Sequence, residues 1–208
     1  MKPRARVMTA PLRPSTSAVV APAFGRGDCP AVHTGGSEPA TWRPVLLGGL
    51  FKLTGRSSWA LGDYRRRQAG MAEIERRARG YGLPPILWPD PWPTDYLRAM
   101  RAVTWAFAVG RGHDLATRLF RDGFQRGREL SIEAHVLSAG AEVGLDRRDV
   151  HAGLRDPAVK AELRGATEAA HALGVFGVPT VDVAGELFWG DDRLEDAAAH
   201  ALSVGRPA

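Results

Sequence analysis

The sequence contains a single cysteine, Cys29, among its 208 residues. One thiol excludes an intramolecular disulfide, a Cys-x-x-Cys redox pair and a zinc site built from several cysteines. No apolar run approaches the roughly 18 residues of a membrane-spanning helix. The charge is little biased, because 28 Lys and Arg against 23 Asp and Glu leave a net charge of +5 that is spread along the chain. We therefore expect one globular cytoplasmic domain without a membrane or nucleic-acid partner.

Residues 1–41 have little of what a hydrophobic core needs. They hold six of the fifteen prolines, one aromatic residue (Phe24) and one leucine (Leu12). From Trp42 onward, amphipathic segments with recognisable starts and stops follow one another. The composition predicts an atypical N-terminus over 1–41, either disordered or produced by a shifted reading frame, and a folded domain over 42–208.

The folded part alternates between sheet and helix signals. The apolar run 43–48, bounded by proline and glycine, predicts a buried strand. Asp63 can cap a helix that stops at Gly80, and the arginines of this helix, interspersed with acidic residues, indicate a solvated face. Residues 86–93 hold too many prolines for a helix. Further helices are expected to start at Thr94, His113, Ser131, Asp146 and Asp156.

The last segment returns to strands. Residues 175–183 and 186–189 are β-branched or alternating and flank an Ala-Gly turn, which predicts an antiparallel hairpin. A final helix follows, with Asp191 or Asp192 available as its cap. This order outlines an α/β sheet interrupted by an all-helical insertion over about 88–174.

The motif Gly-Val-Pro-Thr at 177–180 lies between the last inserted helix and the hairpin. It resembles the cis-proline loop of thioredoxin-fold proteins, where the residue before proline pairs through its main chain with the cysteinyl part of a thiol ligand. Taken alone, Val-Pro-Thr favours an ordinary trans proline, since few X-Pro bonds are cis. The surrounding sequence decides in favour of the loop.

Four blocks carry a wider resemblance. Residues 43–55, Trp-Pro-Asp-Pro-Trp-Pro at 88–93, Leu-Arg-Ala-Met-Arg at 97–101 and the block 174–194 occur in an order that resembles the 2-hydroxychromene-2-carboxylate isomerase family. That family is similar to the kappa-class glutathione transferases and has a DsbA-like thioredoxin fold. The resemblance implies a thioredoxin-like (DsbA-like) sheet and a glutathione-dependent isomerase that acts on a small aromatic carboxylate during aromatic hydrocarbon catabolism. The resemblance also favours a homodimer.

The resemblance further implies where glutathione binds. Val178 and Pro179 would carry its cysteinyl residue, and Asp192, with the main chain of Asp191, would hold its γ-glutamyl ammonium group. The alternative is that both aspartates simply cap the final helix. Arg56 stands where family members usually have Asn, so it either changes a glutathione contact or pairs with a carboxylate of glutathione or of the substrate.

The N-terminal part departs from the family pattern. The family begins with a central strand and a Ser-Pro-Tyr motif, whose serine stabilises the glutathione thiolate. No Ser-Pro-Tyr occurs here, and Ser15 and Ser17 lie in no comparable motif, so no catalytic residue is assigned. Only residues 17–21 could replace the missing strand. A frame shift near Trp42 would explain both departures.

Two other functions stay open. Cys29-Pro30 resembles the first half of a DsbA Cys-Pro-x-Cys motif, although Val32 replaces the second cysteine, and a thiol oxidoreductase or glutathione transferase is therefore the second hypothesis. The third is a non-catalytic binding module that keeps the ligand loop without an activating serine. The six histidines form no pair at ligand spacing, so we expect no metal site.

Overall fold

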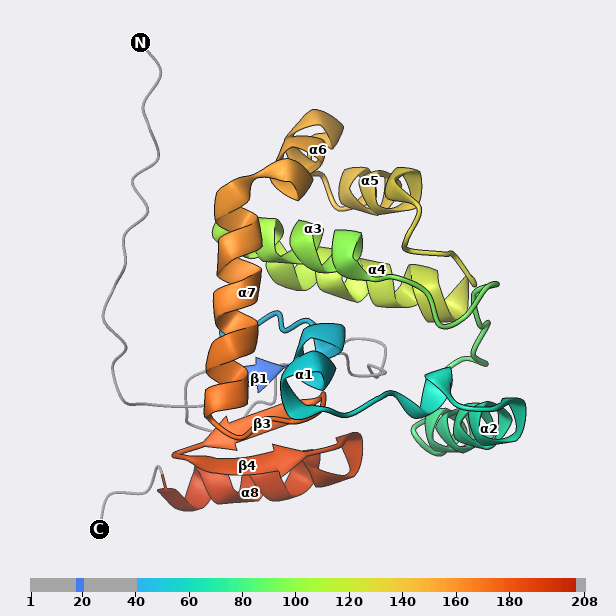
Figure 1. The fold of residues 1–208 in the computed structure, drawn as a ribbon, viewed down its shortest axis with the longest axis vertical. Helices are drawn as coiled ribbons and strands as arrows, with labels where there is room; N and C mark the ends of the chain where they lie inside the picture. Colours follow the sequence, from blue (N-terminus) through green and yellow to red (C-terminus); the bar gives the residue numbers. More distant parts are fainter. Residues whose placement is uncertain (1–17, 21–40, 205–208) are drawn as a thin grey trace.

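The computed structural model describes residues 18–20 and 41–204 (Figure 1). A four-stranded sheet has the strand order β2-β1-β3-β4. The strands are β1 (Ala18–Val20), β2 (Thr41–Trp42), β3 (Thr180–Val183) and β4 (Glu186–Trp189). β1 runs parallel to β2, whereas β3 is antiparallel to both of its neighbours.

The short strand β1 completes the centre of the sheet. Its Val19 is in register with Trp42 of β2 on one side and with Val181 of β3 on the other. The prediction that residues 17–21 can replace the missing strand is confirmed for Ala18–Val20. The rest of the N-terminal segment up to residue 40, including Ser15, Ser17 and Cys29, lies outside the described residues.

The predicted strand over 43–48 is wrong. β2 ends at Trp42, and α1 (Leu47–Thr54) begins inside the predicted strand. Val45 and Leu50 are buried, but against helix α7 (Pro157–Ala172) rather than between strands. Gly49 permits this approach, since a Cβ built there would lie 3.0 Å from Thr167 Cγ2. A short apolar run fits a buried helix as well as a strand, and packing decided between them.

Helix α2 (Tyr64–Gly80) projects from the rest of the molecule at one side (Figure 1). It follows the short 3-10 helix η1 (Trp59–Leu61), and the predicted cap is confirmed because Asp63 Oδ1 accepts from Arg66 N at 2.9 Å. Trp59 rests on the helix at Gly70, where a built Cβ would lie 2.3 Å from the indole. Trp59 also contacts Trp92 of the extended segment 86–93 with ring centroids 5.6 Å apart.

Five helices form the helical insertion. They are α3 (Leu97–Ala108), α4 (Gly112–Gln125), α5 (Glu133–Glu142), α6 (Arg147–Arg155) and α7. Small and aliphatic side chains make the core of α3 to α6, with Ala102, Ala106, Leu115, Val136 and Val150 fully buried. The predicted cap at Thr94 is wrong: Asp95 accepts from Leu97 N at 2.8 Å, and the Thr94 hydroxyl donates to Glu129 instead.

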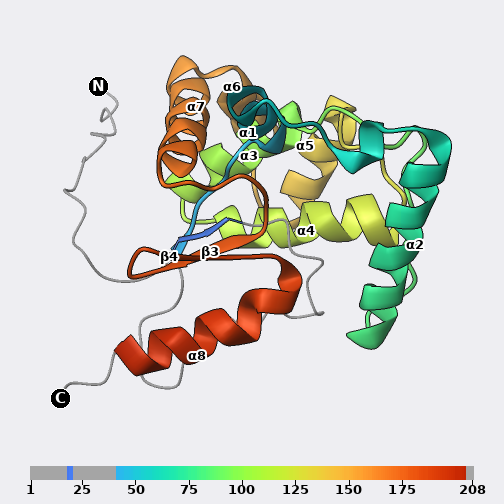
Figure 2. The same ribbon diagram turned by 60° about the horizontal axis from the view of Figure 1, so that its bottom comes forward.

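Helices cover both faces of the hairpin β3–β4 (Figure 2). On one face, Val181, Val183 and Phe188 pack against Ala197 of α8 (Leu194–Val204). On the other, Leu187 and the loop before β3 pack against the core shared by α1 and α7. The strand expected over 175–183 begins only at Thr180. The segment before it is therefore a loop held at the edge of a buried sheet.

Candidate functional site

The loop between α7 and β3 contains the predicted proline motif. Its Val178–Pro179 peptide bond is cis. The Thr180 hydroxyl donates to the Gly177 carbonyl at 2.8 Å, and Gly190 N donates to the Pro179 carbonyl at 3.0 Å, which ties the loop to the end of β4. Among the described residues, neither main-chain polar group of Val178 has a hydrogen-bond partner. The loop therefore has a donor and an acceptor available to an extended ligand.

Three side chains form a stack beside this loop. The Arg56 guanidinium lies 4.4 Å from the centroid of the Phe176 ring, and the Phe176 and Trp189 rings lie 4.8 Å apart. Gly177 makes room for the indole, because a Cβ there would lie 2.4 Å from Trp189 Nε1. Arg56 is exposed, and within the described ranges no carboxylate lies at ion-pair distance from it. The stack thus presents a cation and a half-exposed aromatic face together.

The two aspartates after β4 have different partners. Asp191 Oδ1 accepts from Arg77 Nη1 at 2.6 Å, and its Oδ2 accepts from the Tyr81 hydroxyl at 2.9 Å. Asp192 Oδ1 lies 3.7 Å from the same arginine nitrogen, and its side chain is 60% exposed. Both residues belong to the 3-10 helix η2 (Asp191–Arg193), whose N-cap is Gly190 without a side-chain cap. Asp191 therefore binds α2 instead of capping the helix.

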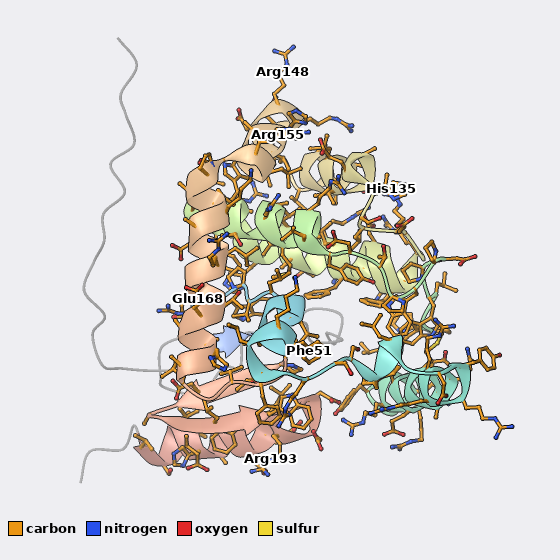
Figure 3. The ribbon with its side chains drawn as sticks, viewed as in Figure 1. Phe51, His135, Arg148, Arg155, Glu168 and Arg193 are labelled. Atoms are coloured by element: carbon orange, nitrogen blue, oxygen red, sulfur yellow. The ribbon has the colours of Figure 1, made fainter. Side chains whose placement is uncertain are left out.

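The Asp192 side chain folds back over Gly190. The φ of Gly190 is +111°, a backbone conformation that residues other than glycine rarely adopt. A Cβ built there would lie 2.4 Å from Asp192 Oδ1. Since Gly190 N also donates to Pro179, the carboxylate and the loop share one turn of main chain. Arg193, which comes next, pairs with Asp196 at 2.7 Å and marks this end of the molecule in Figure 3.

Sequence reasoning missed Arg77 and Tyr81. The solvated face expected for the arginines of α2 holds for Arg76, which pairs with Glu73 and is 67% exposed. Arg77 also contacts Glu73, at 3.0 Å, but it reaches Asp191 across 114 positions of sequence. The spacing of Arg77 and Tyr81 puts both on one face of a helix, yet no local pattern shows which distant segment that face meets.

The structure assigns no catalytic group. The candidates Ser15, Ser17 and Cys29 lie outside the described residues. Within residues 18–20 and 41–204, no three His, Cys, Asp or Glu side chains gather in a way that could hold a metal ion. In the same ranges no helix combines the length and apolar character needed to cross a bilayer.

Comparisons with known proteins place this geometry in a wider group. The model of the DSBA-like thioredoxin domain family matches residues 39–201. The chain is 29% identical over 136 residues to a 2-hydroxychromene-2-carboxylate isomerase of Sphingobium xenophagum. That alignment covers 64% of this chain and 66% of the relative, so the chain spans slightly less than two thirds of the relative's length.

Solved structures show the same fold. A 2-hydroxychromene-2-carboxylate isomerase structure matches with a TM-score of 0.69 and 20% identity, over 79% of this chain and 80% of that one. A probable DsbA oxidoreductase of Streptomyces coelicolor matches with a TM-score of 0.59 and 23% identity, over 78% and 68%. A DsbA of Pseudomonas aeruginosa matches with a TM-score of 0.55 and 16% identity, over 96% and 94%.

Proposed function

The chain belongs to the DSBA-like thioredoxin domain family, and we propose that it is a glutathione-dependent isomerase of the 2-hydroxychromene-2-carboxylate type. The fold of the family, a thioredoxin-like sheet with an all-helical insertion, is the one observed here. The relative from Sphingobium xenophagum supports the isomerase class. The observation that carries the glutathione part is the main chain of Val178, which has no hydrogen-bond partner among the described residues and lies next to Pro179, whose carbonyl is bound by Gly190 beneath the Asp192 carboxylate.

The described residues fit an extended peptide ligand with an amino-acid end. The N–H and C=O of Val178, which have no partner in residues 18–20 and 41–204, suit the main chain of a cysteinyl residue, in the manner of an added strand. Asp192 has an exposed carboxylate whose cationic neighbour is 3.7 Å away, so it can accept the γ-glutamyl ammonium group. Pro179 fixes the loop through its carbonyl, and Arg56 is available to a ligand carboxylate.

When bound, glutathione would supply a thiolate that adds reversibly to the conjugated system of the substrate, which permits rotation about a former double bond before the thiolate leaves. The protein's share is to hold and orient the two molecules. The exposed face of Trp189 and the charge of Arg56 suit a small aromatic carboxylate. We place the protein in the cytoplasm, where glutathione is abundant and reduced.

A thermal melt with millimolar glutathione tests the binding step. A ligand that binds only the folded state raises the Tm as its concentration increases, and we expect a saturating rise for the unaltered chain. Asp192→Asn should abolish the rise. The matched control is Asp196→Asn, which removes an exposed carboxylate one turn further on, where it pairs with Arg193. An unaltered chain whose Tm does not respond to glutathione would overturn the proposal.

Turnover separates the isomerase from a non-catalytic binding module. The module is a specific alternative because the sequence lacks the Ser-Pro-Tyr motif whose serine activates glutathione in the resembling family. Glutathione-dependent conversion of 2-hydroxychromene-2-carboxylate would establish the isomerase. Binding of glutathione without conversion would leave the module, and glutathione-dependent reduction of a disulfide substrate would favour the oxidoreductase.

A further inference from the structure

One side chain of α2 connects three carboxylates. The Arg77 guanidinium lies 3.0 Å from Glu73 on its own helix, 2.6 Å from Asp191 and 3.7 Å from Asp192 on η2. The hydroxyl of Tyr81, the residue that caps the C-terminal end of α2, donates to the other oxygen of Asp191. Both oxygens of Asp191 are therefore bound, and the C-terminal end of α2 is fastened to the turn after β4.

The hydroxyl of Tyr81 is a dependable donor. Burial raises the pKa of Tyr81, and its hydrogen bond to the Asp191 carboxylate acts in the same direction. The phenol thus keeps its proton at any physiological pH. Arg77 is also charged throughout, since its hydrogen bond to Glu73 raises its already high pKa. The two contacts to Asp191 form one constant clamp.

The clamp of Arg77 and Tyr81 binds Asp191 and leaves the adjacent Asp192 more exposed. Asp191 is 29% exposed and is held from two sides, whereas Asp192 is 60% exposed and, within the part of the chain that the structure describes, has only the longer contact to Arg77. Asp192 folds over Gly190, whose N–H binds the Pro179 carbonyl. Because Asp191 and Asp192 are adjacent in η2, the contacts of Asp191 help to set the position of the main chain that carries Asp192.

We propose that Arg77 and Tyr81 are positioning residues, which hold Asp191 so that the Asp192 carboxylate faces the γ-glutamyl ammonium group of glutathione. This inference rests on the proposed function and adds α2 to the ligand site. Without the clamp, Asp191 would be an unpaired carboxylate beside Asp192, and the turn would lose the contact that fixes its direction. The amino group of the ligand is then recognised poorly, although the proline loop is untouched.

Two ligands and matched variants test the clamp. Isothermal titration measures the affinity of glutathione and of its desamino analogue, which lacks only the ammonium group. The unaltered chain should prefer glutathione by about tenfold, the usual scale of one charge-assisted hydrogen bond. Arg77→Gln and Tyr81→Phe should reduce this preference, mainly because the affinity for glutathione falls while the affinity for the desamino analogue changes little. Arg76→Gln is the control, because Arg76 contacts Glu73 but neither aspartate.

The outcomes distinguish the clamp from the proposed function. If the unaltered chain binds no glutathione, the proposed function fails and the clamp with it. If the unaltered chain binds and prefers glutathione, but Arg77→Gln keeps the same preference as Arg76→Gln, only the clamp is overturned. If a variant loses affinity for both ligands equally, its structure has been disturbed in general, and this result would also contradict the inference. Arg77→Lys, which keeps the charge but offers a less directional donor, should restore part of the preference.

Discussion

The main-chain N–H of Leu46 donates to the hydroxyl of Thr167, 121 positions later, at 3.1 Å. The same hydroxyl donates to the Leu163 carbonyl at 2.7 Å. Leu46 is the N-cap of α1, whose first amide groups have no partner within the helix. Thr167 thus satisfies the start of α1 from the middle of α7 and joins the sheet region to the helical insertion.

Replacing Thr167 with valine should reveal the strength of this junction. Valine keeps the shape of the side chain but leaves the Leu46 N–H without its partner, which costs about 1 kcal/mol, the lower end of the range for a buried group, because this hydrogen bond is only partly buried. Urea unfolding should show this loss as a lower midpoint. Thr167→Ser, which keeps the hydroxyl, is the control and should lose less. A valine variant at least as stable as the serine variant would show that the hydrogen bond is not important.

Two glycines in neighbouring helices should respond to alanine in opposite directions. A Cβ at Gly153 of α6 would lie 2.4 Å from the Trp105 ring, whereas a Cβ at Gly165 of α7 would meet nothing within 4 Å. Gly153→Ala should therefore destabilise the protein by about 1–3 kcal/mol through overpacking. Gly165→Ala should stabilise it by about 0.5–1 kcal/mol, since alanine is the better helix former. Thermal melts of the two variants should move to opposite sides of the unaltered Tm, and equal shifts would contradict the close contact with Trp105.

The contribution of Glu129 to the stability of the folded protein should be lost in acid. The Ser131 hydroxyl, followed by the Thr94 hydroxyl, donates to Glu129 and lowers its pKa below the ordinary 4.5. A group with a lowered pKa in the folded state stabilises the protein above its unfolded pKa, and this contribution is lost as the pH falls through the folded value. Glu129→Gln should therefore be less stable than the unaltered chain at pH 7, and the difference should shrink as the pH falls well below 4.5. Urea midpoints at both pH values measure it. A difference that persists unchanged in acid would exclude this origin.

Local patterns predicted the helices whose caps and stops are written in the sequence. Asp63 before α2 and Asp156 before α7 both accept main-chain hydrogen bonds as expected. The segment 43–48 was predicted wrongly because its apolar residues fit two structures, and Thr167 on a distant helix selects one of them. For the site, the motif at 177–180 led to the loop, and the family resemblance led to Asp192. Arg77 remained hidden because its function depends on a contact with a segment that sequence spacing does not reveal.

Arg56 is available to the carboxylate of a ligand, either of glutathione or of the substrate. Its guanidinium is held over Phe176 and, within the residues described, has no acidic partner, so the charge is free for a ligand. Arg56→Gln should lower the affinity for a ligand that carries a carboxylate by about tenfold, the usual scale of a charge-assisted hydrogen bond. Lys52→Gln, at an exposed basic residue on the preceding helix, is the control for a change in net charge.

Two ligand pairs identify the carboxylate concerned. If Arg56 binds the glycine carboxylate of glutathione, Arg56→Gln should lower the affinity for glutathione but not the affinity for glutathione with an amidated glycine. If Arg56 instead binds the aromatic substrate, glutathione affinity should be unchanged and the KM for the aromatic carboxylate should rise. The second result is expected, because Arg56 and the half-exposed Trp189 both contact Phe176 and together suit a ring that carries a carboxylate. If Arg56→Gln and Lys52→Gln have the same glutathione affinity and the same KM for the aromatic carboxylate, the contact of Arg56 with Phe176 is purely structural.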